Sequence, residues 1–215
     1  LTTDFGTKDH YVGSVKGALF NELENVNIVD VSHNISPFNI VEAAYIIENS
    51  YKNFPEGSIH IIGVDSEKTI EQSHLVIKLD NHFFICANNG IMSLLASKIN
   101  PEKIIEINIH NDKITTFSVI DVFVKIAAHI YRGGSIDLVG NQIYELKELY
   151  NLNPILNEKS NEISGNVIYV DNYDNVVTNI SKKIFLEFGK SRSFEINARN
   201  YIFKEIVSSY GNAIR

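Results

Sequence analysis

Acidic side chains and glycines gather near the start of the chain, between Thr3 and Gly13. The pattern predicts a short strand that ends at Asp4, a glycine turn at Gly6, and then Asp9 just before a helix begins. Open α/β folds bind ligands at the carboxyl edge of the sheet, where these carboxylates would lie. There they could accept hydrogen bonds from two ribose hydroxyls or pair with an ammonium group. The structural alternative is that Asp4 ends the strand and Asp9 caps the helix.

A second polar cluster joins Asp30, Ser32 and His33 at the end of a strand-like run. Adjacent residues on a strand point to opposite faces, so Ser32 and His33 are poorly placed to act as a nucleophile and its base. We therefore interpret them as capping and turn residues. Phe38, which follows Pro37, could form one wall of a ligand pocket, although core packing explains an aromatic there equally well.

Two further clusters also lie next to predicted strands. Asp65 ends the run 59–64 and precedes a polar loop, so its carboxylate could position or activate a water molecule. The segment 171–175 crowds four polar side chains around Tyr173, between two strand-like runs. A β-turn explains that composition without any function, with Asp174 or Asn175 in a left-handed conformation.

The composition limits the kinds of function that the chain can have. With 215 residues, of which 44% are hydrophobic and 21% charged, it can bury a real core. A formal net charge of -7 and scattered basic residues make nucleic-acid binding unfavourable. The histidines show no metal-ligand spacing and no dinucleotide or nucleotide glycine pattern occurs, so we expect no metal and no such cofactor. Cys86, in an apolar stretch, is expected to be a buried, inert thiol.

The sequence holds no apolar run near the ~20 residues that a membrane span needs. The chain opens on Leu1 without the charged-then-apolar pattern of a signal peptide. We therefore expect a soluble, cytoplasmic protein. Because the sequence lacks an initial methionine and stops at Arg215, a fragment of a longer chain is also consistent with it.

β-branched runs alternate with helical patterns through the first two thirds of the chain. This alternation predicts an α/β sheet with helices on its faces. The predicted strands cover 27–31, 59–64, 75–79 and 82–86, and the predicted helices cover 11–23, 40–52, 91–97 and 121–131.

After Gly140 the pattern changes, and short strand-like runs appear with little helix between them. We expect an N-terminal α/β domain over 1–145, a linker over 146–161 and a small C-terminal β-rich domain over 162–215. At about 50 residues, the last is thin for an independent domain and could be incomplete.

The order of these motifs resembles that of the S-adenosylmethionine (SAM) hydroxide adenosyltransferase family, which is related to the fluorinase and chlorinase enzymes. The resemblance extends from Leu1 to about Ile180. It is carried by Thr3-Asp4-Phe5-Gly6 with Asp9, Asp30-Val31-Ser32-His33 with Pro37, Ala43-Ala44, Phe54-Pro55-Glu56-Gly57, Asn88-Asn89-Gly90, and the stretch from Asp171 to Thr178-Asn179-Ile180.

The resemblance implies an α/β domain followed by a C-terminal β-barrel domain. It also implies a homotrimer that holds SAM between neighbouring subunits, with SAM as substrate and no cofactor. Asp4 would then bind the ribose hydroxyls, while Asp9 and Asp171 would hold the methionine ammonium group. The chain stops before the Asn-Ser motif that the family uses for the methionine carboxylate.

The resemblance also assigns aromatic and amide groups to the nucleoside. Phe38 falls where the halogenases carry a tryptophan against the ribose. Tyr173 would stack on adenine, and Asn175 would form hydrogen bonds with the edge of the adenine ring. These residue types suit a purine, because an aromatic ring offers a stacking face and an amide offers both a donor and an acceptor.

The hydrolytic members of the family use an aspartate, an arginine and a histidine near the attacking water. Asp65 retains the aspartate, whereas Gln72 falls at the arginine and Ser118 at the histidine. Glutamine and serine cannot stabilise hydroxide by charge, so we expect weaker water activation unless Lys68 or His74 substitutes.

We expect hydrolysis of SAM to adenosine and L-methionine, by water or hydroxide attack at C5′. The changes at Gln72 and Ser118 leave open a non-catalytic protein that binds SAM or adenosine. Val119 argues against a halogenase, because it falls where fluorinase has serine and chlorinase has glycine. Asp65 nearby would also repel a halide ion.

Overall fold

The computed structural model describes residues 1–96, 99–109, 116–149 and 153–212. The chain divides at residue 150 into two compact units, Leu1–Tyr150 and Asn151–Arg215, and each is considered by itself. Among the described helices, none combines the length and the apolar character that crossing a bilayer requires.

Within the described part of the first unit, a mixed sheet has the strand order β1-β2-β4-β3-β5-β6. β1, β2 and β4 run parallel to one another, while β3, β5 and β6 each run antiparallel to their neighbours. The strands are β1 (Thr2–Thr3), β2 (Ile59–Gly63), β3 (His74–Leu79), β4 (His82–Ala87), β5 (Lys103–Ile107) and β6 (Gly140–Ile143).

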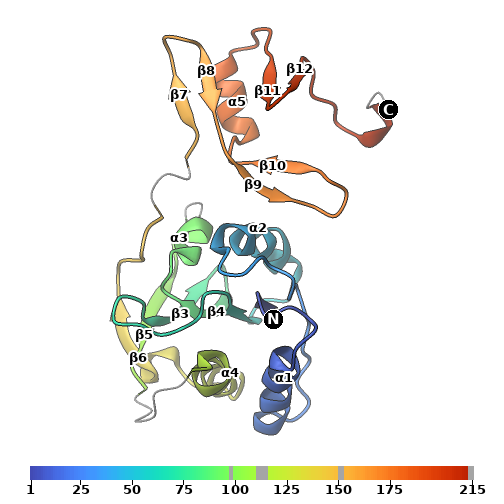
Figure 1. Ribbon diagram of the computed structural model, residues 1–215. Helices are drawn as coiled ribbons and strands as arrows, with labels where there is room; N and C mark the ends of the chain where they lie inside the picture. Colours follow the sequence, from blue (N-terminus) through green and yellow to red (C-terminus); the bar gives the residue numbers. More distant parts are fainter. Residues whose placement is uncertain (97–98, 110–115, 150–152, 213–215) are drawn as a thin grey trace. The chain divides into compact units, whose positions relative to one another are not determined.

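Helices cover both faces of this sheet, which explains why consecutive residues of its central strands are buried rather than every second one (Figure 1). α1 (Tyr11–Glu22) and α4 (Val124–Tyr131) pack on one face, around Phe123 and Ile85. α2 (Ile40–Ser50) and α3 (Ile91–Ala96) pack on the other face, around Phe84 and Leu75. The first unit is therefore a three-layer α/β/α structure with two cores.

Most of the elements predicted for this unit are confirmed. The predicted strands 59–64, 75–79 and 82–86 are β2, β3 and β4, and each predicted helix is present. The last of these begins with a π-helical turn, Val119–Phe123, and the helix that starts at Ile40 ends in the 3-10 turn Tyr51–Asn53. The predicted strand 27–31 is wrong, because that segment is not assigned to a strand and a single parallel bridge to β1, between Ser32 and Thr2, follows directly after it.

Residues 153–212 of the second unit contain three separate hairpins and one α-helix. None of its described side chains is buried. The structure therefore supports a β-rich unit, and within these residues the strands form three pairs. The elements are β7 (Ile155–Asn157) with β8 (Glu162–Ser164), β9 (Val167–Val170) with β10 (Val176–Thr178), α5 (Lys182–Gly189), β11 (Ile196–Ala198) with β12 (Tyr201–Phe203), and the 3-10 turn Tyr210–Asn212.

Two histidines pair inside the first unit, near the amino-terminal ends of β2 and β4. His60 Nε2 lies 3.2 Å from His82 Nδ1, and the His60 ring stacks on Phe84 with 4.8 Å between ring centroids. Tyr51 meets both imidazoles edge-on. Burial, followed by the charge of His82, lowers the pKa of His60 to about 4, so His60 is neutral in the folded protein near pH 7.

This pair makes the stability of the protein sensitive to acid. The unfolded chain takes up a proton on His60 near pH 6.5, whereas the folded chain does so only near pH 4. The contribution of neutral His60 to the free energy of unfolding should therefore be fully present above pH 6.5. The free energy of unfolding should fall as the pH decreases towards 4, by up to roughly 3 kcal/mol. Urea unfolding across this range measures the loss. His60→Phe should lose less stability on acidification than the wild type, and parallel losses would contradict the assignment.

Candidate functional site

The parallel pairing of β1 with β2 brings two carboxylates to one edge of the sheet. Thr3 pairs with Gly63, and the Asp4 amide bonds to the Gly63 carbonyl oxygen at 3.4 Å. Asp4 and Asp65 thus follow neighbouring strands at their carboxyl ends, where open α/β sheets bind ligands. The two are close enough for the charge of Asp4 to act on Asp65.

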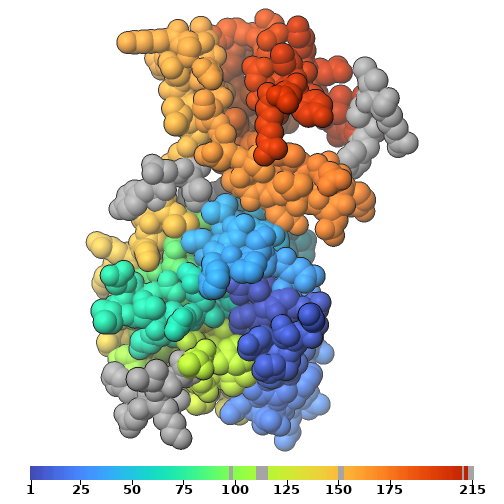
Figure 2. All heavy atoms as spheres, in the orientation of Figure 1, coloured from blue at the N-terminus to red at the C-terminus, as the bar shows by residue number. Residues whose placement is uncertain are grey.

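Phe38 lies directly against this edge. Its backbone N–H donates to Asp4 Oδ2 at 2.9 Å, which fixes one oxygen of the carboxylate. Phe38 has a φ of +63°, an unfavourable conformation for a bulky residue, and its side chain is 74% exposed. An aromatic held in a strained backbone conformation at the surface fits a ligand-facing role better than core packing. Figure 2 shows the first residues (dark blue) at the surface beside α2 (light blue).

The surroundings of Asp65 disfavour the charged form of its carboxyl group. Its backbone is left-handed, with a φ of +45°. Partial burial, then the charges of Asp4 and Glu67, raise the pKa of Asp65, while the charge of Lys147 opposes them. A carboxyl group with a raised pKa is better matched to taking a proton from water near neutral pH than an ordinary one.

Two amide side chains hold the backbone around Asp65. Gln72 Nε2 donates to the carbonyl oxygens of Asp65 (2.8 Å) and Glu67 (2.9 Å), and Gln72 is only 8% exposed. Asn89 Nδ2 donates to the carbonyl oxygens of Val64 (3.1 Å) and Asp65 (3.2 Å). Both donors of the Gln72 amide group are therefore directed at the loop, so Gln72 shapes it.

The two residues considered as substitutes for the lost cation lie in different settings. His74 Nε2 lies 3.0 Å from the Ser66 carbonyl oxygen, and burial lowers the pKa of His74, so the ring is neutral near pH 7. Lys68 is exposed in the loop, and its charge acts on His74. Neither supplies the positive charge that acts on Asp65.

Ser118 is buried at the start of the π-helical turn. It is 3% exposed, and its Oγ has no hydrogen-bond partner among the described residues. The next residue, Val119, packs against β2: a Cβ added at Gly63 would lie 3.0 Å from Val119 Cγ2 and 3.1 Å from Phe5 Cζ. The π-helical turn thus sits against the strand that leads to Asp65, and π-helical turns often mark functional sites.

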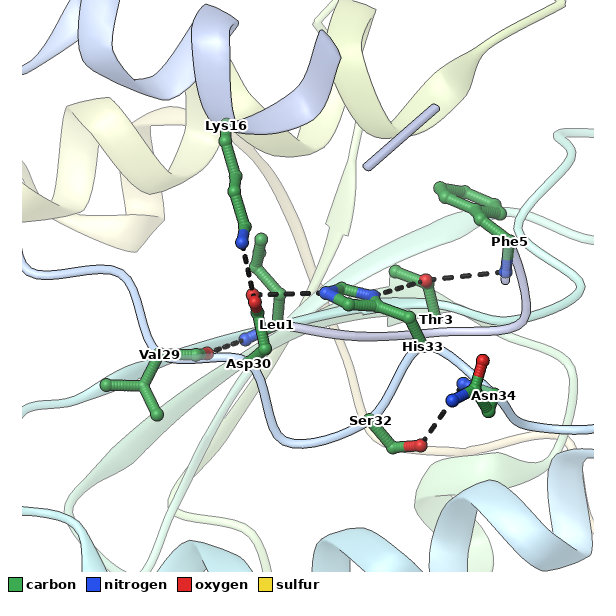
Figure 3. Close-up of polar contacts among 9 residues, drawn as sticks. All are labelled: Leu1, Thr3, Phe5, Lys16, Val29, Asp30, Ser32, His33 and Asn34. Carbon is green, nitrogen blue, oxygen red and sulfur yellow. Dashed lines mark hydrogen bonds and ion pairs between the residues drawn. The ribbon is translucent and has the colours of Figure 1, made fainter. Parts of the chain in front are cut away.

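His33 belongs to a polar network beneath Asp4 (Figure 3). Its Nδ1 lies 2.8 Å from Thr3 Oγ1, and its Nε2 lies 3.0 Å from Asp30 Oδ1. Among the described residues Nε2 has no well-aligned hydrogen bond, so the contact with Asp30 is mainly electrostatic. Lys16 Nζ donates to Asp30 Oδ2 at 2.5 Å. Burial raises the pKa of Asp30, but the bonds from Lys16 and His33 outweigh it and the pKa falls below its usual value.

The backbone of His33 strengthens this arrangement. Its carbonyl oxygen accepts from Gly6 N at 2.7 Å, and the Ser32 carbonyl oxygen accepts from Thr3 N at 2.9 Å. Ser32 Oγ instead accepts from Asn34 N, so the two neighbouring side chains do point different ways (Figure 3). Ser32 is a turn residue as predicted. His33 does more than that, because it fixes the end of β1.

Asp171 organises the turn between β9 and β10. Its Oδ1 accepts from the backbone N–H groups of Tyr173 (2.8 Å) and Asn175 (2.9 Å), and its Oδ2 accepts from Asn175 Nδ2 (2.7 Å). The Asn175 side chain is the main reason that the pKa of Asp171 lies below its usual value. Asp174 has a φ of +62°, which confirms the predicted left-handed residue. The Tyr173 side chain is 82% exposed.

The predicted site residues thus fall into two groups. Asp4, Phe38 and Asp65 meet at one edge of the first unit, while the 171–175 turn belongs to the second unit and is intact by itself. Asp9 is exposed just before α1, where His10 is the N-cap and no side chain caps the helix, so the capping interpretation of Asp9 is wrong. The described residues hold no cluster of metal-ligating side chains.

The sequence did not indicate a role for Lys16 or the pairing of Thr3 with His33.

Replacing His33 by alanine would leave Thr3 and Asp30 without their buried partner. We expect it to lower the free energy of unfolding by about 1–3 kcal/mol, whereas Ser32→Ala should change it by no more than about 0.5 kcal/mol. Urea unfolding of both variants provides the measurement, and equal effects would refute the special role of His33.

Comparisons with known proteins place these features in context. The family model for the SAM hydroxide adenosyltransferase N-terminal domain matches residues 1–140, and the model for its C-terminal domain matches residues 165–215. The (R)-S-adenosyl-L-methionine hydrolase of Methanocaldococcus jannaschii is 30% identical over 213 residues, which cover 96% of this chain and 76% of that protein. The hydrolase of the same name from Thermus thermophilus is 26% identical over 205 residues, covering 88% and 78% of the two chains.

A solved structure has the same overall fold. The crystal structure of an uncharacterized conserved protein from Thermotoga maritima superimposes with a TM-score of 0.84 at 26% identity. The match covers 99% of this chain and 84% of that one.

Proposed function

The chain belongs to the SAM hydroxide adenosyltransferase family, and we propose on that basis that it hydrolyses S-adenosyl-L-methionine to adenosine and L-methionine. The oxygen of a water molecule forms a bond to C5′ of the ribose as the bond from C5′ to sulfur breaks. The electron pair of the broken bond goes to sulfur, which leaves as the neutral thioether of methionine. The observation that carries the proposal is the pair of carboxylates, Asp4 and Asp65, at the ends of neighbouring parallel strands.

Asp65 is the proposed partner of the attacking water. An ionised carboxylate accepts a proton from water as the new C–O bond forms, and Ser118 would add a second polar group to the water site. The buried Ser118 Oγ, without a partner among the described residues, supports this assignment. Gln72 serves the same step indirectly, because its amide group fixes the Asp65 loop.

Asp4 and Phe38 are the proposed ribose contacts. Asp4 uses one oxygen to accept from the Phe38 backbone, and we propose that the carboxylate also binds the ribose hydroxyls beside the exposed Phe38 ring. Asp9 and Asp171 would hold the methionine ammonium group, since each is a carboxylate at least partly open to solvent. Fixing both ends of the substrate would place C5′ in line between water and sulfur, and such positioning lowers the barrier to the reaction.

Tyr173 and Asn175 are the proposed adenine contacts, by stacking and by hydrogen bonding. We further propose that the second unit is part of a barrel-like domain and that a homotrimer forms the site between neighbouring subunits. The absence of any buried side chain among the described residues of this unit supports the trimer, because exposed apolar residues such as Ile155 and Val176 then gain a partner surface.

A non-catalytic protein that binds SAM or adenosine is the second candidate. It is favoured by one observation: Gln72, expected at the position of the family arginine, and His74, expected as a possible substitute, both form hydrogen bonds with the loop backbone. The halogenase alternative is not favoured, because Val119 is fully buried between Gly63 and the core and Asp65 contributes negative charge nearby.

Incubation with SAM separates these candidates. The wild type should release adenosine and methionine, and Asp65→Asn should form adenosine at least about 100-fold more slowly because the proton acceptor is lost. Asp4→Asn should mainly raise the KM for SAM. Chromatography of adenosine gives the rates. Tight SAM binding by calorimetry without adenosine release would instead identify a binding protein.

The configuration at sulfur provides a further test. The relatives are named as hydrolases of (R)-SAM, and we propose that this chain also selects the R configuration at the sulfonium. With the ribose and the amino-acid group both fixed, inverting sulfur swings C5′ out of line with the water. In a mixture of the two sulfur epimers, only the R form should disappear, as chiral chromatography would show. Equal consumption of both epimers would refute this selectivity.

A further inference from the structure

The segment after β6 returns to the edge of the sheet where Asp65 lies. We call residues 144–149 the strap. β6 ends at Ile143, which pairs with Ile104, and the strap then reaches the turn after β4, where Lys147 N donates to Asn88 Oδ1 at 3.0 Å. Leu146 packs against the core beneath α2 and α3.

Leu149 holds the end of the strap over Gly90. A Cβ at Gly90 would lie only 2.5 Å from Leu149 Cγ, and Gly90 has a φ of +102°. The close contact therefore requires glycine. With Leu146 on the core and Lys147 N on Asn88, the strap is fixed at three successive points on the first unit.

The turn that holds the strap also holds Asp65. Asn88 accepts from the strap, and the adjacent Asn89 donates to the carbonyl oxygens of Val64 and Asp65. The adjacent residues Asn88 and Asn89 thus connect the backbone of Lys147 to the backbone of Asp65. Asn88 and Lys147 also line the same open groove, of about 880 Å³.

The charges around Asp65 come from three elements. Asp4 follows β1 and Glu67 lies in the loop after β2, and both are negative. The opposing positive charge is that of Lys147, on the strap. Gln72, beside the same loop, is neutral and directs its amide group at the loop backbone, so it supplies no positive charge to Asp65.

We propose that Lys147 is a positioning residue for the hydrolysis step, because the strap and the Asn88–Asn89 turn hold this positively charged residue close to the Asp65 loop. This inference rests on the proposed function. Lys147 transfers no proton: Asp65 accepts the proton of the attacking water, C5′ exchanges sulfur for oxygen, and the positive charge of Lys147 stabilises Asp65 as a carboxylate before the step. The positive charge is thus supplied by the strap, a different element of the fold from the loop that Gln72 holds.

The test compares Lys147→Met and Lys147→Arg with the control Lys68→Met, whose charge acts on His74 instead. Without the cation, Asp65 protonates at higher pH, so the acid limb of the rate profile moves to higher pH. On the acid limb of the wild-type profile, Lys147→Met should form adenosine roughly 3- to 10-fold more slowly than wild type, and on the plateau at higher pH within about twofold of it. Lys147→Arg should restore the wild-type profile, and Lys68→Met should leave it unchanged.

A direct titration separates this inference from the hydrolysis proposal. The ¹³C resonance of the Asp65 carboxyl group, assigned with Asp65→Asn, reports its pKa whether or not the protein turns over. A higher pKa in Lys147→Met than in wild type supports the role of Lys147. Coincident titrations and coincident rate profiles in wild type and Lys147→Met would overturn it. If the wild type forms no adenosine, the hydrolysis proposal fails, and the titration alone decides the coupling between the two charges.

Discussion

Two residues of β1 determine the geometry of the site, since Thr2 and Thr3 pair in parallel with Ile62 and Gly63. A strand this short makes few ladder bonds, so its position depends on other contacts. The network of Thr3, His33 and Asp30 supplies them, together with the backbone bond from Thr3 N to the Ser32 carbonyl oxygen. Gly63 permits the close approach, because Thr3, Phe5 and Val119 surround the place of its missing side chain.

The site concentrates features that are unfavourable for folding alone. Phe38 and Asp65 both have positive φ, and Asp65 is partly buried beside the negative charge of Asp4. Such conformations cost about 1–3 kcal/mol each and persist where surrounding contacts enforce them. Here the amide groups of Gln72 and Asn89 and the Asp4 carboxylate provide those contacts. Strain and like charge at one sheet edge are typical of a site organised for binding or chemistry.

Hydrophobic patterning predicted the buried strands and all four main helices of the first unit, because their apolar runs are long. It missed β5, in which charged residues interrupt the apolar run, and β6, which is short and polar, and it overestimated 27–31, which lies along an edge. The placement of Asp4 and Asp65 at neighbouring strand ends was predictable, because the carboxyl ends of parallel strands meet at one edge of an α/β sheet. The Thr3–His33 contact spans 30 residues and depends on a register that no local pattern encodes. Lys147, one exposed lysine among many, carried no signal in the sequence.

The contact between Gly90 and Leu149 has a consequence for how this sequence can diverge. No side chain fits at position 90 while leucine occupies position 149. Alanine at 90 would be strained by the φ of +102° whatever residue occupies 149, and its Cβ would also displace Leu149, the strap and the lysine that the strap carries. Position 90 should therefore remain glycine among relatives that retain a cation at 147. The glycine at position 90 would then be retained because it keeps the positive charge at position 147 in place.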